Sequence, residues 1–159
     1  MGAMASVLSY DYDPFETCDP TQGRRPPLRA YQERCSRETW RHLAAGRNVV
    51  VVVPTGGGKT GIAADVIETA AEASLRVAMF VHRRELLRQA SQALRSLAIP
   101  HGLVVPGRAL HRDLVQVASI DLVTSRMGRG YGSWLETIDV AVIDEAQHLL
   151  APTWAELAA

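Results

Sequence analysis

The sequence has 159 residues, of which 47% are hydrophobic, and its 17 acidic side chains balance 17 basic ones. A chain of this length suits one domain with its own core, and no apolar run approaches the roughly 18–20 residues of a membrane-spanning helix. Because the N-terminus also lacks the basic and apolar regions of a signal peptide, we expect a cytoplasmic protein with no membrane partner.

The first 27 residues predict a tag followed by an irregular arm. Residues 9–27 are rich in Asp, Pro, Gly and Thr, and they show no hydrophobic periodicity. We therefore place one partial domain at residues 28–159 and expect residues 1–27 to lie outside its core.

The domain opens with a predicted helix over residues 30–45. Gly46 follows as a C-terminal cap, and apolar side chains recur in the helix at roughly helical spacing. These side chains are Tyr31, Cys35, Trp40 and Leu43. Next, residues 48–53 (N-V-V-V-V-V) form a β-branched run that is too short for a helix. This run predicts a fully buried strand.

In the rest of the chain, predicted helices alternate with predicted strands. The patterns predict helices over residues 59–73 and 84–98, and strands over residues 76–81, 115–119 and 140–143. Strands that alternate with helices at this spacing indicate βαβ crossovers. The predicted fold class is therefore α/β, with a mainly parallel sheet and helices on both faces.

The segment between the valine run and the next helix has the composition of a phosphate-binding loop, or P-loop. Its sequence is P-T-G-G-G-K-T, and Val53 stands where the strict GxxxxGKS/T template has its first glycine. Glycines let backbone N–H groups converge on phosphate oxygens, and the helix N-terminus adds its dipole. The predicted ATP-binding residues are Pro54, Thr55, Gly56, Gly57, Gly58, Lys59 and Thr60.

Lys59 is the single lysine of the chain, beside sixteen arginines. A compact ammonium is not interchangeable with a planar guanidinium, so this position is a candidate for chemistry that requires lysine. The pattern predicts that Lys59 reaches the β- and γ-phosphates of ATP and that the Thr60 hydroxyl binds Mg²⁺. The alternative is a glycine-rich turn without a ligand, which the combination of strand, loop and helix disfavours.

Two carboxylates follow the last predicted strand. Val140–Ile143 runs directly into Asp144 and Glu145, and ligands of open α/β sheets bind at the carboxyl ends of the strands. Asp144 can hold Mg²⁺ through water, while Glu145 orients and deprotonates the attacking water. Acids that merely decorate a helix N-terminus are the alternative, and the upstream P-loop favours the catalytic interpretation.

Three motifs in this order, P-T-G-G-G-K-T, V-H-R-R-E-L-L-R-Q and V-I-D-E-A-Q-H, resemble the first RecA-like domain of superfamily 2 helicases. The resemblance is nearest to the DEAH/DEAQ proteins of the type III restriction enzyme and UvrB-like group. It covers Leu28 to about Trp154. It implies a RecA-like P-loop NTPase that couples hydrolysis of Mg-ATP to movement along a nucleic acid, as a helicase or translocase.

The resemblance also implies roles for single residues. Gln32 matches the glutamine that reads adenine, with Arg29 beside it, and a side-chain amide can both donate to and accept from an adenine edge. A surface glutamine on a helix is the alternative. Gln147 stands where the closest relatives have histidine, and it stays a catalytic candidate because either side chain could hydrogen-bond across the nucleotide cleft.

A nucleic-acid partner is implied by the resemblance and agrees with the charge distribution. Residues 24–131 carry all 17 basic side chains against 8 acidic ones, a net charge of +9, while residues 132–159 carry five acids and no base. A basic segment suits a phosphate-rich partner, and a solvated arginine-rich surface is the alternative. The resemblance places contacts to the nucleic-acid backbone, with DNA favoured over RNA, at Arg83, Arg84 and Ser119.

The family's next motif, and a second RecA-like domain with arginine fingers, would lie beyond Ala159. We therefore expect a sheet that is incomplete at the C-terminus and has open edges where the absent strand belongs, between the P-loop strand and the Asp144 strand. The isolated chain should hydrolyse ATP weakly and need a second domain in cis or trans. The other hypotheses are a non-catalytic fragment that needs a partner, and a P-loop ATPase that does not act on nucleic acid.

Overall fold

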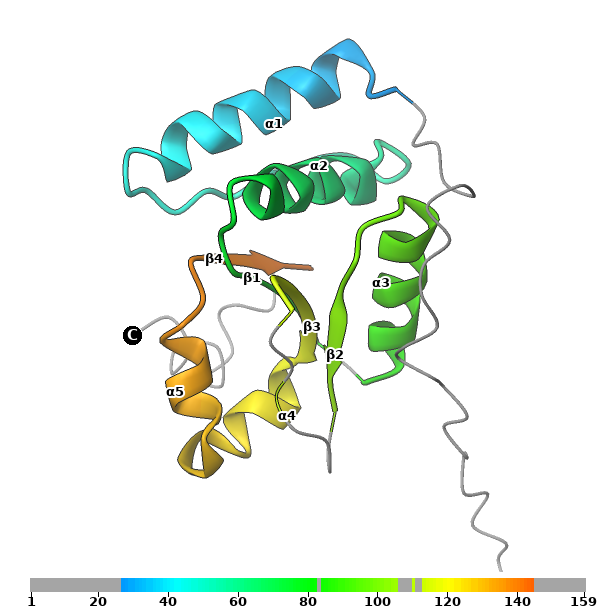
Figure 1. The fold of residues 1–159 in the computed structure, drawn as a ribbon. Helices are drawn as coiled ribbons and strands as arrows, with labels where there is room; N and C mark the ends of the chain where they lie inside the picture. The colour runs from blue at the N-terminus through cyan, green and yellow to red at the C-terminus, as the bar shows by residue number, and fades with distance from the viewer. Residues whose placement is uncertain (1–26, 83, 106–109, 111–112, 145–159) are drawn as a thin grey trace, which may run out of the picture.

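The structure is a computed structural model that describes residues 27–82, 84–105, 110 and 113–144. Residues 1–26, Arg83, Glu145 and Gln147 lie outside the described residues, as does the side chain of Arg84. In chain order the elements are α1 (Ala30–Leu43), α2 (Lys59–Glu72), β1 (Val77–Val81), α3 (Arg84–Ser96), β2 (Gly102–Val104), β3 (Val115–Ser119), α4 (Ile120–Thr124), the 3₁₀ turn η1 (Met127–Arg129), α5 (Tyr131–Leu135) and β4 (Val140–Ile143) (Figure 1).

The four strands form one parallel sheet in the order β2-β3-β1-β4. The central strand β1 pairs with β3 on one side and with β4 on the other. Its register places Val81 opposite Ser119 and Phe80 opposite Ile143, so the carboxyl ends of three strands meet at one edge of the sheet. The predicted parallel α/β sheet is confirmed.

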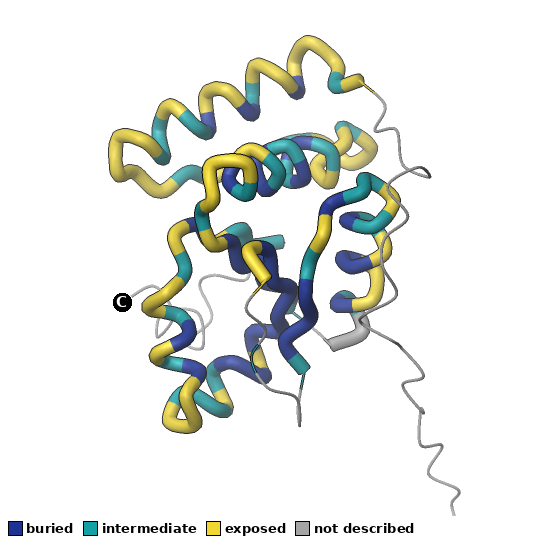
Figure 2. The backbone as a smooth tube through the Cα atoms, in the orientation of Figure 1, coloured by how far each residue is buried: buried dark blue, intermediate teal, exposed yellow. Residues whose placement is uncertain are grey.

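Helices cover both faces of this sheet, because successive side chains of a strand point to opposite faces. One core lies between the sheet and helices α2 and α3, and its largest members include Val77, Met79, Val81, Ile67 and Leu94. The other core lies between the sheet and helices α4 and α5, and it contains Ala78, Phe80, Ile120, Val123 and Trp134. Figure 1 shows α2 and the pair α4 and α5 on opposite sides of the strands, and in Figure 2 the strands are mostly buried.

Four short elements were not predicted from the sequence: β2, α4, η1 and α5. None exceeds five residues, which is too short for a periodic pattern to be recognised. They are nevertheless well packed. The Trp134 ring of α5 meets the Phe80 ring edge-on at a centroid distance of 6.2 Å, and its indole N–H donates to the buried Gln116 side chain of β3. No helix in the described part of the chain is long and apolar enough to cross a membrane.

The valine run is the main correction to the sequence prediction. Residues 48–53 form no strand, and the Val50 and Val52 side chains are 72% and 89% exposed. A strand forms by pairing with a neighbour, and the sheet of the described residues has four strands that do not include this segment. The β-branched run therefore has the local preference for a strand but no partner among the described residues. The strand that precedes Asp144, β4, pairs only with β1 and so forms one edge of the described sheet.

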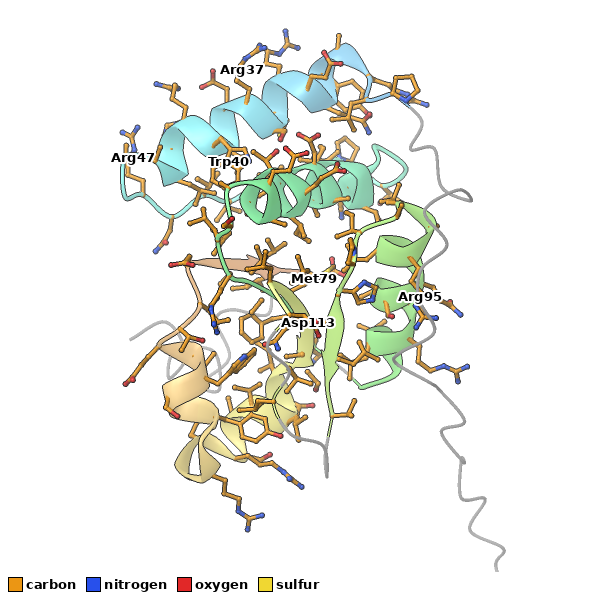
Figure 3. The ribbon with its side chains drawn as sticks, viewed as in Figure 1. Arg37, Trp40, Arg47, Met79, Arg95 and Asp113 are labelled. Atoms are coloured by element: carbon orange, nitrogen blue, oxygen red, sulfur yellow. The ribbon has the colours of Figure 1, made fainter. Side chains whose placement is uncertain are left out.

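Helix α1 is present as predicted, but a different stripe of it is buried. The helix packs on α2, and its buried residues are the polar Gln32, Ser36 and Thr39, whereas the expected apolar member Tyr31 is 37% exposed. The Ser36 hydroxyl donates to the Asp65 carboxylate of α2. Of the predicted apolar stripe, Trp40 packs against the core and lies between α1 and α2 (Figure 3). The buried stripe of α1 is thus polar, and its Ser36 forms a hydrogen bond to α2.

A half-buried histidine links α3 to β2. The His101 Nδ1–H donates to the Ile99 carbonyl at 2.8 Å, so Nε2 of the neutral ring accepts from the Ser91 hydroxyl, also at 2.8 Å. Burial lowers the pKa of His101 from its ordinary value of 6.5, and Arg95 adds to this effect. The hydrogen bond to Ile99 and the charge of Asp113 act in the opposite direction. The net lowering means that this packing favours the neutral ring.

We predict that acidification destabilises the fold through His101. Its pKa is lower in the folded state, so the unfolded chain binds more protons between that pKa and 6.5. This contribution is complete above pH 6.5 and decreases as pH falls below it. Urea unfolding of wild type and His101→Gln across this range should show a shallower pH dependence in the variant. His42→Gln, at the end of α1, controls for the loss of a histidine as such. Equal slopes for wild type and His101→Gln would contradict the prediction.

Candidate functional site

A glycine loop leads from the valine run into α2. The Gly57 N–H donates to the Pro54 carbonyl at 2.9 Å, which closes a tight turn. Gly56 and Gly58 have φ angles of +78° and +72°, in the left-handed region that glycine adopts without a steric cost. Gly58 is the N-cap residue of α2 and makes no side-chain capping bond. The first turn of α2 therefore presents backbone N–H groups that no capping side chain covers.

Close packing also requires glycine at position 57 of this loop. A Cβ atom on Gly57 would lie 2.4 Å from Cγ1 of Val53 and 2.9 Å from the Pro54 carbonyl oxygen. On Gly58, a Cβ atom would lie 2.2 Å from Nε2 of Gln32. At Gly57 the obstacle includes a backbone carbonyl, whereas at Gly58 it is the end of a long side chain that can turn aside, so there the positive φ is what favours glycine. The shape of the loop therefore depends on glycine.

The N-terminus of α1 lies against the loop, although more than 20 residues separate the two in sequence. The Tyr31 hydroxyl donates to the Gly57 carbonyl at 2.7 Å. The Gln32 amide donates to the carbonyls of Gly57 and Gly58 at 3.3 and 3.4 Å, while its oxygen accepts from the Arg29 backbone N–H at 2.8 Å. The tertiary fold thus brings the predicted residue Gln32 to the predicted loop, and the backbone N–H of Arg29 holds the Gln32 side chain.

Lys59 and Thr60 are the first two residues of α2, and both are exposed. Pro54, Thr55 and Gly56 are exposed as well. From this N-terminus, α2 runs across the sheet and contacts β1 and β4. An ammonium, a hydroxyl and uncapped N–H groups are therefore collected at one accessible helix end. This is the donor set that an oxyanion requires.

The remaining predicted residues lie at the carboxyl edge of the sheet. Asp144 directly follows β4, and its backbone N–H donates to the Phe80 carbonyl at 3.0 Å, which continues the pairing with β1. Ser119 ends β3, but its side chain is 0% exposed, and its hydroxyl has no hydrogen-bond partner among the described residues. No hydrogen bond or ion pair in the described part of the chain joins Asp144 to the glycine loop.

Sequence reasoning missed Tyr31 as a residue of this site. The helical pattern assigned its ring to an apolar stripe, whereas its hydroxyl contacts the loop. The only signal in the sequence was its position directly before Gln32, at the start of a helix. Adjacent helix residues point in different directions, so a role for Gln32 did not imply one for Tyr31.

Comparison with known proteins adds one finding to this geometry. The family model described as "Type III restriction enzyme, res subunit" matches residues 25–159. The match contains the glycine loop, the N-terminus of α1 and all four strands. None of the curated proteins compared with the chain matches it.

Proposed function

The chain belongs to the family of the type III restriction enzyme res subunit, the first RecA-like domain of superfamily 2 helicases, and from this membership we propose that it is the ATP-binding motor domain of a helicase or translocase that acts on DNA. The observation that carries the proposal is the glycine loop at the uncapped N-terminus of α2, with Lys59 and Thr60 exposed beside it. Its substrate is Mg-ATP.

The residues present fit a magnesium nucleotide. A loop whose Gly57 leaves no room for a Cβ atom, joined to a helix N-terminus, suits a polyphosphate that must approach the backbone closely. Lys59 would hold the β- and γ-phosphates as a point charge. Thr60 and Asp144 offer a hydroxyl and a carboxylate, and such hard oxygen ligands suit Mg²⁺ alongside phosphate oxygens and water.

For hydrolysis, we assign the base to Glu145, the residue after Asp144. Asp144 continues β4 at the carboxyl edge of the sheet, where ligands of parallel α/β sheets bind. A carboxylate one residue further can orient and deprotonate the attacking water. Gln147 would hydrogen-bond across the nucleotide cleft and link hydrolysis to movement. A second RecA-like domain, in cis or trans, would supply the arginine finger.

The nucleic acid would bind at the ends of β1 and β3. Arg83 and Arg84 follow β1 directly in the sequence, and arginine contacts to backbone phosphates give affinity without sequence readout. Ser119 ends the neighbouring strand β3. Because its hydroxyl is buried, Ser119 can take part only if this edge of the sheet opens.

We predict that the chain binds single-stranded DNA and that the logarithm of the association constant falls linearly as the logarithm of the salt concentration rises. Two phosphate contacts contribute roughly 1.4 to the slope on a single strand, so Arg83→Gln with Arg84→Gln should reduce the slope by about that amount. Fluorescence anisotropy of labelled DNA and RNA strands across a salt series measures this slope and compares the two nucleic acids.

The matched control removes the same charge from another surface. Arg34 and Arg37 are exposed on α1, and Figure 3 shows that Arg37 points away from α2. Arg34→Gln with Arg37→Gln should leave the slope unchanged. If the wild-type chain binds Mg-ATP but neither nucleic acid, the chain is a P-loop ATPase that acts on another substrate. Tighter binding of RNA would correct the choice of DNA.

A further inference from the structure

The carbonyls at the junction of the glycine loop and α2 are held from outside the loop. The Gly57 carbonyl accepts hydrogen bonds from both the Tyr31 hydroxyl at 2.7 Å and the Gln32 amide at 3.3 Å. The Gly58 carbonyl accepts from the same amide at 3.4 Å and from the N–H groups of Gly61 and Ile62 in α2. The Gly57 carbonyl is therefore held by two donors of α1, whereas the Gly58 carbonyl is held mainly by the first turn of α2.

This arrangement also orients an adjacent N–H group. In a planar trans peptide, the C=O of one residue and the N–H of the next point in opposite directions, and the described residues contain no cis peptide. When donors of α1 hold the Gly57 carbonyl, the N–H group of Gly58 must face away from those donors. Gly58 is the N-cap residue of α2, where the proposed phosphate site lies.

We propose that Tyr31 is a positioning residue of the nucleotide site: its hydroxyl, together with the Gln32 amide, holds the Gly57 carbonyl so that the N–H group of Gly58 faces the phosphates. The inference rests on the proposed function, because it needs a polyphosphate at the loop. Glycines 56 and 58 have positive φ angles, and a glycine-rich backbone has many accessible conformations. A contact that selects one of them lowers the cost of ordering the loop on binding.

The geometry favours this role over stacking of the Tyr31 ring on adenine. The hydroxyl makes a hydrogen bond of ordinary length to a backbone carbonyl, and Tyr31 shares that acceptor with Gln32. The Gln32 oxygen is itself held by the Arg29 N–H at the start of α1. The pair therefore joins the helix to the loop through three polar contacts at the loop carbonyls. A stacking role would depend on the ring face and leave the hydroxyl unused.

The two roles predict different results for Tyr31→Phe, which removes only the hydroxyl. If Tyr31 positions the loop, the Kd values for Mg-ATP and for Mg-tripolyphosphate, which has no base, should both rise by the same factor. One hydrogen bond of ordinary strength corresponds to roughly a three- to tenfold change. Isothermal titration of the full chain with each ligand measures both Kd values.

Thr39→Val is the matched control, since it also removes one hydroxyl that donates to a backbone carbonyl. The acceptor in this case is Cys35 within α1, and Thr39 lies further along the helix from the loop than Tyr31 does. This control should leave both Kd values unchanged. An equal loss of affinity in Thr39→Val would assign the effect to α1 as a whole and overturn the inference, as would a loss for ATP alone or no loss in Tyr31→Phe. If the wild-type chain binds neither ligand, the proposed function itself fails.

Discussion

Replacing Lys59 with alanine is expected to abolish Mg-ATP binding to the full chain. Lys59 is the single lysine of the sequence and the first residue of α2, exposed beside the glycine loop. Its ammonium would form charge-assisted hydrogen bonds to two phosphates, and loss of two such bonds corresponds to roughly a hundredfold or more in affinity. Isothermal titration with Mg-ATP measures the change.

Lys59→Arg should fail as well, because a planar fork cannot take the place of a compact ammonium at a point-charge site. Arg47→Ala is the matched control. It removes one exposed positive charge from the segment before the loop, and Figure 3 places Arg47 just beyond the end of α1. The control should bind Mg-ATP like wild type. Unchanged ATP affinity in Lys59→Ala would refute the assignment of the loop.

Replacing Glu145 with glutamine is expected to stop hydrolysis while Mg-ATP still binds. The amide is nearly isosteric with the carboxylate but cannot take a proton from water. Loss of a general base lowers the rate by about 10²–10⁴-fold. Because an arginine finger contributes about 10³–10⁵ to such rates, steady-state turnover should be measured with a second RecA-like domain supplied, with and without single-stranded DNA.

Glu136→Gln makes the same chemical change at an exposed position just after α5 and should retain wild-type turnover. Binding of Mg-ATP to Glu145→Gln, measured by titration, separates lost catalysis from lost affinity. Wild-type turnover in Glu145→Gln would show that another group activates the water. Lost turnover together with lost binding would instead assign Glu145 to nucleotide binding.

Much of the fold follows from local patterns that a reader can recognise in the sequence. Helices α1, α2 and α3 have 13 or 14 residues each, which is long enough for amphipathic or capping signals to accumulate. The runs that became β1, β3 and β4 are short, apolar and rich in valine. Their alternation with helices predicts parallel pairing, because βαβ crossovers return the chain in the same direction.

The glycine loop is likewise a local feature. Gly56 and Gly58 adopt positive φ angles, and the Gly57–Pro54 hydrogen bond closes its turn within four residues. The preferences of neighbouring residues are sufficient to predict a turn here, whereas the contacts that hold its Gly57 carbonyl come from α1. The sequence therefore predicts the loop and its candidate phosphate donors, Lys59 and Thr60, without information about the rest of the fold.

Only the tertiary structure decided which residues that are distant in the sequence contact one another. The valine run has strong strand propensity, yet a strand requires a hydrogen-bonded neighbour, and the run has none in the described sheet. Ser119 stands at a strand end but is buried, and Tyr31 matches an apolar stripe but donates to the loop. In each case the preference of the residue is local, whereas its role depends on which surface the folded chain places against it.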